Sequence, residues 1–212
     1  MKKVLIWFTL IVVLIAFGTA SAATTKESHK ATSSFGAGKF AIGGNLGYSI
    51  GFGNAFKEYS YGFYNPYYGE WGWKIKNKLG ISFGVKFKYK INPKFSLGGI
   101  LEYQGGSVDV TRTGGYWGGG ASGSYHFSNL LASAIYHLNP QQKNTYYLDG
   151  GLGLYKASGS TNMGIHMGAG VEHFFQPDLA LDGGARFHII FTSGNSTTYL
   201  NIYAGVNYYF GQ

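Results

Sequence analysis

Large apolar residues alternate with small or polar residues along most of the chain after residue 39. Between 79 and 91 every second residue is large and apolar, and those between are glycine, serine or lysine. A period of two is typical of β-strands, because successive side chains point to opposite faces of a sheet. Such runs recur eight times, over 40–52, 78–91, 95–104, 130–138, 146–155, 163–172, 179–189 and 200–210. Strands of roughly ten residues can cross a hydrocarbon core when they are tilted by about 45°.

The segments that connect these runs differ in length. Residues 92–94, 139–144 and 176–178 are short and contain turn-forming residues, whereas 54–74 and 105–119 are long. Transmembrane barrels have short periplasmic turns and longer outer loops. We therefore predict an all-β fold, an eight-stranded antiparallel up-and-down transmembrane β-barrel, with the two long segments as outer loops.

The fourth run contains a change of phase. Tyr125 and Phe127 alternate with the opposite parity to Leu130. One extra residue in a strand restores such a phase, so we expect a β-bulge near Asn129.

Alternation alone does not say which face lies inside. A soluble barrel of the lipocalin type also has eight alternating strands, with its apolar face inside. Here the polar phase is mainly Gly, Ser, Ala and Asn, and small residues suit a crowded barrel interior. The apolar phase carries aromatic residues towards several strand ends, as at lipid interfaces. We therefore expect the apolar face to meet lipid.

This orientation places charges of both signs inside the barrel. They are Lys78, Lys86, Lys88, Arg186, Glu102, Asp149, Glu172 and Asp182. Unpaired charges in a narrow interior are costly, and side chains can fill an eight-stranded barrel. We therefore predict a network of ion pairs that plugs the interior. Lys88 and Lys90 adjoin a predicted turn, and we expect water to reach them near the mouth.

The first 22 residues are typical of a secretory signal peptide. Two lysines precede an apolar run of about 14 residues, and Ala20-Ser21-Ala22 forms a cleavage site. The run is shorter than the roughly 20 residues of a membrane-spanning helix. We predict a signal peptide over 1–22, a flexible polar segment over 23–38 and the barrel over 39–212.

The composition excludes several classes of site. The chain is 12% charged and has no cysteine, which excludes disulfides, thiolate metal sites and a thiol nucleophile. Its formal charge of +8 could suit nucleic acid, but export argues against that partner. Anionic lipopolysaccharide and phospholipid head groups are the expected counter-charge, and no cofactor is expected.

Two segments, 92–99 and 176–187, have a similar sequence in which a turn is followed by a strand. Near the end of the sequence, Gly205 is followed by two alternating aromatic residues, Tyr208 and Phe210. On these features the chain resembles, over about 39–212, the small outer-membrane β-barrel superfamily that includes the OmpA barrel domain and OmpX-type proteins. The closing residues are similar to that family's insertion signal. The resemblance implies passage through the periplasm with chaperones and assembly by the outer-membrane insertion machinery.

Two histidine patterns suggest chemistry. His126 and Ser128 resemble the His-x-Ser of outer-membrane lipid A deacylases, with Glu102 or Asp149 as a possible acidic partner. That family places the motif near the C-terminus, whereas here it lies in mid-chain, so we expect no catalytic site. His166 and His188 could ligate a metal with Glu172. A third ligand at fixed spacing is missing from the sequence, so we expect hydrogen bonding inside the barrel and no metal.

The segment 59–73 is rich in aromatic residues. They are Tyr59, Tyr61, Phe63, Tyr64, Tyr67, Tyr68, Trp71 and Trp73. We expect a loop that packs as a flap over the barrel mouth or at the lipid interface, and the alternative is a ligand or host-surface contact.

The sequence as a whole favours a non-enzymatic barrel with an envelope-structural or surface-contact role through its outer loops. The alternative is a narrow channel or transporter for ions or small hydrophobic molecules, gated by the aromatic loop. A lipid A-modifying enzyme is the least favoured interpretation.

Overall fold

The computed structural model describes residues 35–36, 38–52, 56, 58–65, 69–113, 119–157, 159–193 and 195–211. All of them belong to the second of two units into which the chain divides, Ser34–Gln212. The predicted signal peptide, and most of the predicted segment over 23–38, lie outside the described residues. Within the described part of the chain, no helix is long and apolar enough to cross a membrane.

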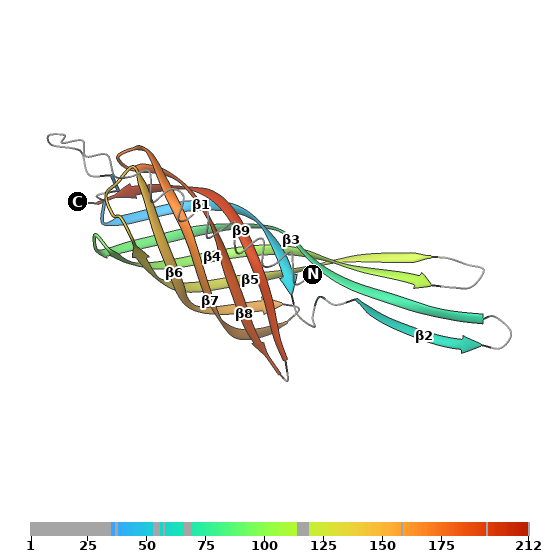
Figure 1. The fold of residues 1–212 in the computed structure, drawn as a ribbon. Helices are drawn as coiled ribbons and strands as arrows, with labels where there is room; N and C mark the ends of the chain where they lie inside the picture. The colour runs from blue at the N-terminus through green and yellow to red at the C-terminus, as the bar shows by residue number, and fades with distance from the viewer. Residues whose placement is uncertain are drawn as a thin grey trace. The chain divides into compact units, whose positions relative to one another are not determined.

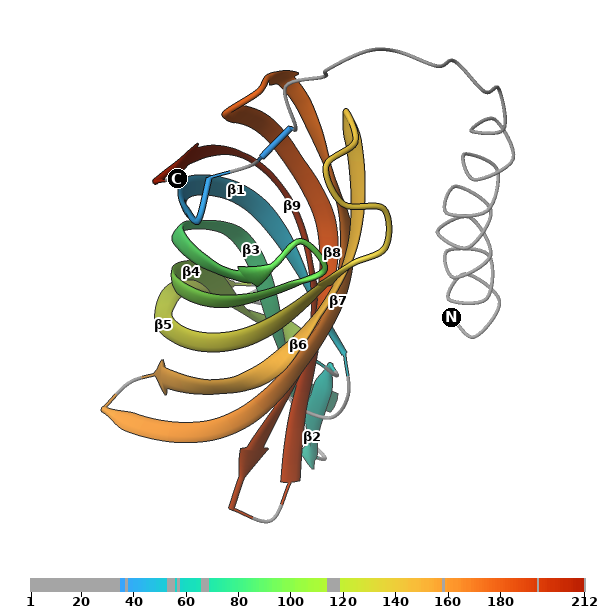
Figure 2. The ribbon, with the colours of Figure 1, turned by 90° about the vertical axis from the view of Figure 1, so that its left-hand side faces the viewer.

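Antiparallel strands build the whole of this unit (Figure 1). They are β1 (Phe40–Phe52), β2 (Tyr59–Asn65), β3 (Gly69–Asn92), β4 (Phe95–Thr113), β5 (Gly120–His137), β6 (Asn144–Ala157), β7 (Ser160–Gln176), β8 (Leu179–Thr192) and β9 (Asn195–Phe210). Eight of them follow one another around a ring in the order β1-β9-β8-β7-β6-β5-β4-β3, and pairing of β1 with β3 closes it (Figure 2). The predicted eight-stranded up-and-down ring is confirmed.

The remaining strand, β2, lies outside the ring. The prediction of a loop over 54–74 is therefore wrong for the residues that form β2 and the start of β3. Strand β2 pairs with the outer part of β3, from Tyr59 opposite Ile75 to Asn65 opposite Gly69. The predicted loop over 105–119 is also largely strand. Aromatic side chains that alternate with Ser and Gly favour extended backbone, so strand pairing continues beyond the ring.

Pairing of β2, β3, β4 and β5 forms a four-stranded sheet that we call the outer extension (Figure 1). It comprises residues 59–65, 69–78, 107–113 and 120–124. At the other end of the ring, β3–β4, β5–β6 and β7–β8 are joined by the three predicted short connections. In the first, the backbone N–H groups of Lys94 and Phe95 both donate to Asn92 Oδ1 at 2.9 Å.

The apolar face of the ring points outward, as predicted. Leu46 is 67% exposed, whereas its neighbour Asn45 is 5% exposed. Ile81 is 70% exposed, whereas Ser82 is fully buried. The polar phase therefore fills the interior, and the soluble alternative with an apolar interior does not fit.

The irregularity in phase lies in β3 rather than in β5. The pairs of β5 with β4 and β6 run without a register shift, so the bulge predicted near Asn129 is wrong. Phe127 simply points inward and Leu130 outward. In β3 the register shifts between Leu79 and Ser82. One extra residue there turns Leu79 inward while Ile81 faces outward.

Candidate functional site

Seven of the eight charged residues predicted inside the barrel are buried there. They are Lys86, Lys88, Glu102, Asp149, Glu172, Asp182 and Arg186. Lys78 is the exception and corrects the prediction, because its side chain is 51% exposed and pairs with Asp109 on the outer extension. The shift in β3 explains the difference, because it reverses the phase on the outer side of Ser82.

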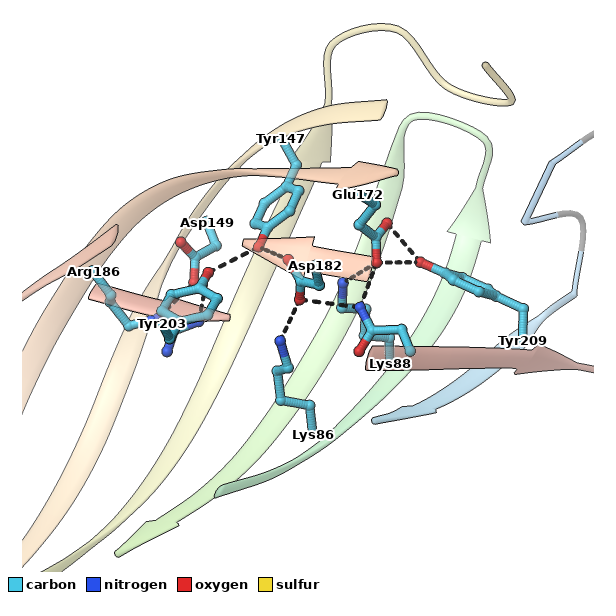
Figure 3. A network of polar contacts seen from close by, with 10 residues as sticks. Lys86, Lys88, Tyr147, Asp149, Glu172, Asp182, Arg186, Tyr203 and Tyr209 are labelled. Carbon is cyan, nitrogen blue, oxygen red and sulfur yellow. Dashed lines mark hydrogen bonds and ion pairs between the residues drawn. The ribbon is translucent and has the colours of Figure 1, made fainter. Parts of the chain in front are cut away.

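Two carboxylates stand at the centre of the buried network (Figure 3). Glu172 accepts hydrogen bonds from Lys88 at 2.7 Å, from Asn207 at 2.6 Å and from Tyr209 at 2.7 Å. Asp182 likewise accepts hydrogen bonds from Lys86, from Tyr147 at 2.6 Å and from Asn207 at 3.0 Å. Asn207 thus bridges both carboxylates. Hydrogen bonds of this kind offset the cost of removing a charge from water.

A third ion pair extends the network along the interior. Arg186 Nε donates to Asp149 Oδ2 at 2.9 Å, and the guanidinium lies 4.8 Å from the ring centre of Tyr203. The Tyr203 hydroxyl is 2.8 Å from that of Tyr147, which bonds to Asp182. We call these residues the inner network: Lys86, Lys88, Tyr147, Asp149, Glu172, Asp182, Arg186, Tyr203, Asn207 and Tyr209.

Lys88 was expected to be solvated, and this expectation is wrong. Its ammonium is buried between Glu172 and the ring of Tyr147, 5.0 Å from the ring centre. Lys90, two residues nearer the turn, is part-buried and donates to the backbone oxygen of Gly36. A segment before β1 therefore contacts the inner end of the interior, which the strand pattern did not reveal.

The inner network leaves little free space. One cavity beside it is lined by residues that include Lys86, Asp149 and Asp182, and a second by residues that include Lys90 and Glu172. Each has a volume of about 10 Å³. A single water needs roughly 10–15 Å³, so each cavity has room for about one water molecule.

Above the inner network, towards the outer end, lies a hydrogen-bonded layer in which amide side chains surround Glu102. Glu102 accepts a hydrogen bond from Asn129 at 3.2 Å and another from Asn201 at 2.9 Å. Asn129 also donates to the hydroxyl of Tyr199 at 3.0 Å. The ring of Tyr199 stacks on His188 with centroids 4.2 Å apart. The interior therefore changes from ion pairs to amides and aromatic rings along its length.

Beyond this layer an apolar pocket of about 410 Å³ opens at the outer end of the ring. Its lining comes from Phe56 and from the outer parts of seven strands, β3 to β9. The deepest contributors, Phe127, Tyr155 and Tyr199, are buried and belong to one hydrophobic cluster with Leu79 and Ile190.

The tyrosines of the inner network were not predicted from the sequence as partners of the buried charges. Tyr203 and Tyr209 have the same parity as Asn201 and Asn207 on β9, and that parity faces inward. The signal was therefore present in the alternation of the last strand. The partners of each tyrosine were not readable, because they come from other strands.

His126 and Ser128 do not form the deacylase-like arrangement with an acidic partner. His126 and Ser128 both point outward, and the His126 ring stacks on Tyr103 at 5.4 Å. Glu102 and Asp149 lie on the opposite, inner face. The geometry therefore keeps the two acids away from the His–Ser pair.

The two interior histidines do lie next to each other, with ring centroids 5.9 Å apart. His166 bonds to Ser133 at 2.8 Å and His188 to Tyr155 at 2.9 Å. Glu172, the third candidate ligand, belongs to the inner network. Among the residues that the structure describes, no group of three or more His, Cys, Asp or Glu could hold a metal ion.

The aromatic segment 59–73 is part of the outer extension rather than a flap. Tyr59, Tyr61 and Trp73 are 44%, 56% and 38% exposed. Tyr64 and Trp71 lie in strands β2 and β3, and Tyr67 and Tyr68 lie outside the described residues. The aromatic side chains that can be placed therefore face solvent or lipid rather than the barrel mouth.

The predicted insertion signal lies on β9. Tyr208 and Phe210 are 47% and 42% exposed on the outer face, and Phe210 stacks on Phe40 at 5.9 Å. Gly205 faces the backbone of β1, where a side chain would collide with the carbonyl oxygen of Gly44. These placements give each residue a structural environment, and their role in assembly stays a prediction.

Comparison with known proteins identifies the family. The chain matches the outer membrane protein beta-barrel domain over residues 10–210, and it belongs to this family. Neisserial surface protein A has 20% sequence identity and a TM-score of 0.51, over 81% of this chain and 97% of that chain. OprG from Pseudomonas aeruginosa has 12% identity and a TM-score of 0.54, over 86% and 100%. No curated protein sequence matches. The fold and location predicted from the sequence, a β-barrel in the bacterial outer membrane, are confirmed.

Proposed function

We propose that the protein is a closed, non-enzymatic barrel that supports the outer membrane and makes surface contacts through its outer extension. The inner network carries this proposal. Two buried ion pairs cross the interior, from β3 to β7 and from β3 to β8, and a third links β8 to β6. The cavities beside them are each about the size of one water molecule. Such packing supports a structural barrel better than the alternative of an open channel.

The outer extension supports the contact role. Its described aromatic side chains are exposed, and exposed aromatic residues often supply much of the energy of a protein contact. Lys74, Lys76 and Lys78 are also exposed there, on one face of β3. Because long outer segments lie on the cell surface in this class of barrel, these lysines are suited to the phosphates of lipopolysaccharide. Lys74 and Lys78 would then exchange their exposed carboxylate partners, Glu58 and Asp109, for phosphate.

Recordings from single proteins in planar lipid bilayers test the closed interior. The mature chain is refolded, its folding is verified by a heat-dependent shift in gel mobility, and conductance is recorded. A silent bilayer is expected. Steady openings would contradict the closed barrel and would move the transport interpretation to first place.

A second experiment tests the contact role. The melting temperature is measured in phosphatidylcholine vesicles with and without lipopolysaccharide, since a ligand that binds the folded state raises it. Replacing Lys74, Lys76 and Lys78 with Gln is expected to reduce that rise. The matched control replaces Lys39, Lys94 and Lys143, three exposed lysines at the opposite end. Equal rises in both variants would refute the lysine contact.

A further inference from the structure

The apolar pocket at the outer end is unlike the rest of the interior. Its volume is about 410 Å³, within the roughly 300–1,000 Å³ that is typical of sites for small molecules. No charged side chain is among the residues known to line it, which are Phe56, Asn77, Leu79, Val108, Tyr125, Phe127, Tyr155, Ala157, Asn162, Ile190, Thr192, Thr197 and Tyr199. A charged ligand would therefore lack a counter-charge in this lining.

The floor of the pocket is held in place from below. Phe127 and Tyr155 both meet Tyr199 edge-on, at 6.0 and 6.5 Å between ring centroids. The Tyr199 hydroxyl accepts from Asn129 at 3.0 Å, and the Tyr155 hydroxyl bonds to His188 at 2.9 Å. Because both hydroxyls are engaged in the layer beneath, the floor presents aromatic rings to the pocket rather than polar groups.

The polar members of the lining lie further out. Thr197 lies two residues beyond Tyr199 on β9, and Asn162 lies near the outer end of β7. An apolar floor with polar groups towards the opening suits a molecule whose apolar body enters first. Aromatic rings that meet edge to face or offset add about 0.5–1.5 kcal/mol beyond the burial of apolar area, so a planar aromatic body fits this floor well.

We propose that this pocket is a binding site for a small, uncharged molecule with an aromatic or otherwise apolar body and one polar end. The site does not depend on the proposed surface-contact role, because it lies inside the ring and above the closed inner network. Bound molecules would stay at the outer end, since the two cavities beside the inner network each have room for about one water molecule.

Three isoleucines allow the proposal to be tested in a lipid bilayer. Ile190 lines the pocket, Ile135 is buried beside the inner network, and Ile202 is 38% exposed on the outer face. The mature chain with labelled isoleucine methyl groups is placed in lipid nanodiscs and titrated with 1-naphthol at neutral pH. The methyl signal of Ile190 is expected to shift and saturate. Ile135 is expected not to respond, and Ile202 should respond, if at all, in proportion to naphthol dissolved in the lipid.

A substitution that fills the pocket provides a second test of the binding site. Ala157→Trp adds a large side chain to the lining, and Ala134→Trp adds the same side chain to the outer face of β5. Saturation at Ile190 is expected to be lost in Ala157→Trp and kept in Ala134→Trp. The proposal is overturned if Ile190 in the unsubstituted protein does not shift, or shifts linearly in parallel with Ile202. Unchanged saturation in a folded Ala157→Trp variant would also overturn it.

Discussion

Lys88→Met is the sharpest test of the inner network. The side chains have similar length, but the substitution removes the ammonium of a residue that is 5% exposed, and this ammonium lies 2.7 Å from Glu172. Removing one partner of a buried ion pair typically costs 3–5 kcal/mol, because the other charge is left uncompensated. Asn207 and Tyr209 still donate to Glu172 in the variant. We therefore expect a loss near the lower limit, about 3 kcal/mol of the free energy of unfolding.

The second substitution Glu172→Gln, added to Lys88→Met, separates charge from packing. The pair is then neutral, and the new amide oxygen can still accept from Asn207 and Tyr209. Groups in direct contact commonly show coupling of about 0.5–3 kcal/mol. The double variant is therefore expected to be more stable than Lys88→Met by roughly 0.5–3 kcal/mol.

Reversible urea unfolding in phosphatidylcholine vesicles measures these differences, followed by tryptophan fluorescence and gel mobility and extrapolated linearly to zero urea. Lys94→Met is the matched control, because Lys94 is exposed in the β3–β4 turn. Exposed substitutions usually change stability by less than about 0.5 kcal/mol. A stabilising role for the Lys88–Glu172 ion pair would be refuted if Lys88→Met is as stable as Lys94→Met, or if the double variant is no more stable than the single one.

Two further substitutions test the outer face and the strand packing. Leu152 is 59% exposed on the outer face, and Leu152→Arg should lower the free energy of unfolding in vesicles by about 2–4 kcal/mol; unchanged stability would show that this face does not meet lipid. Gly151→Ala would press a methyl group against a backbone oxygen of β5, whereas a methyl group at Gly99 meets no atom within 4 Å. We expect Gly151→Ala to cost at least about 1 kcal/mol in the same unfolding assay and Gly99→Ala to cost clearly less; equal effects would contradict the close approach.

The ring and the two faces of its strands could be predicted from the sequence. Even-numbered Leu46 and odd-numbered Asn45 fall on different faces because side chains alternate along a strand. The sequence was insufficient where parity changes within a strand. One extra residue between Leu79 and Ser82 moved Lys78 from the predicted interior to the exposed extension. Such a shift depends on the pairing of β3 with β4, and its position is not encoded in the alternation of either strand.

The sequence also could not predict which charged residues of the inner network pair with one another. Lys86 on β3 meets Asp182 on β8, although β1 and β9 lie between these strands in the ring. Their contact depends on closure of the barrel and on the width that closure produces. Equal numbers of acidic and basic residues on the inner face predicted that ion pairs would form, but not which acid would pair with which base.

The glycines and the inner network are two parts of one packing solution. Glycines on inward-facing positions stand opposite the largest interior side chains. A Cβ atom at Gly170 would collide with the Tyr147 hydroxyl, and one at Gly184 would lie 2.8 Å from that of Tyr203. The small residues of the polar phase therefore make room for long side chains from other strands. Because the inner network is built from several strands, opening the interior would require several buried ion pairs to separate together, and this cost supports the proposal of a closed barrel.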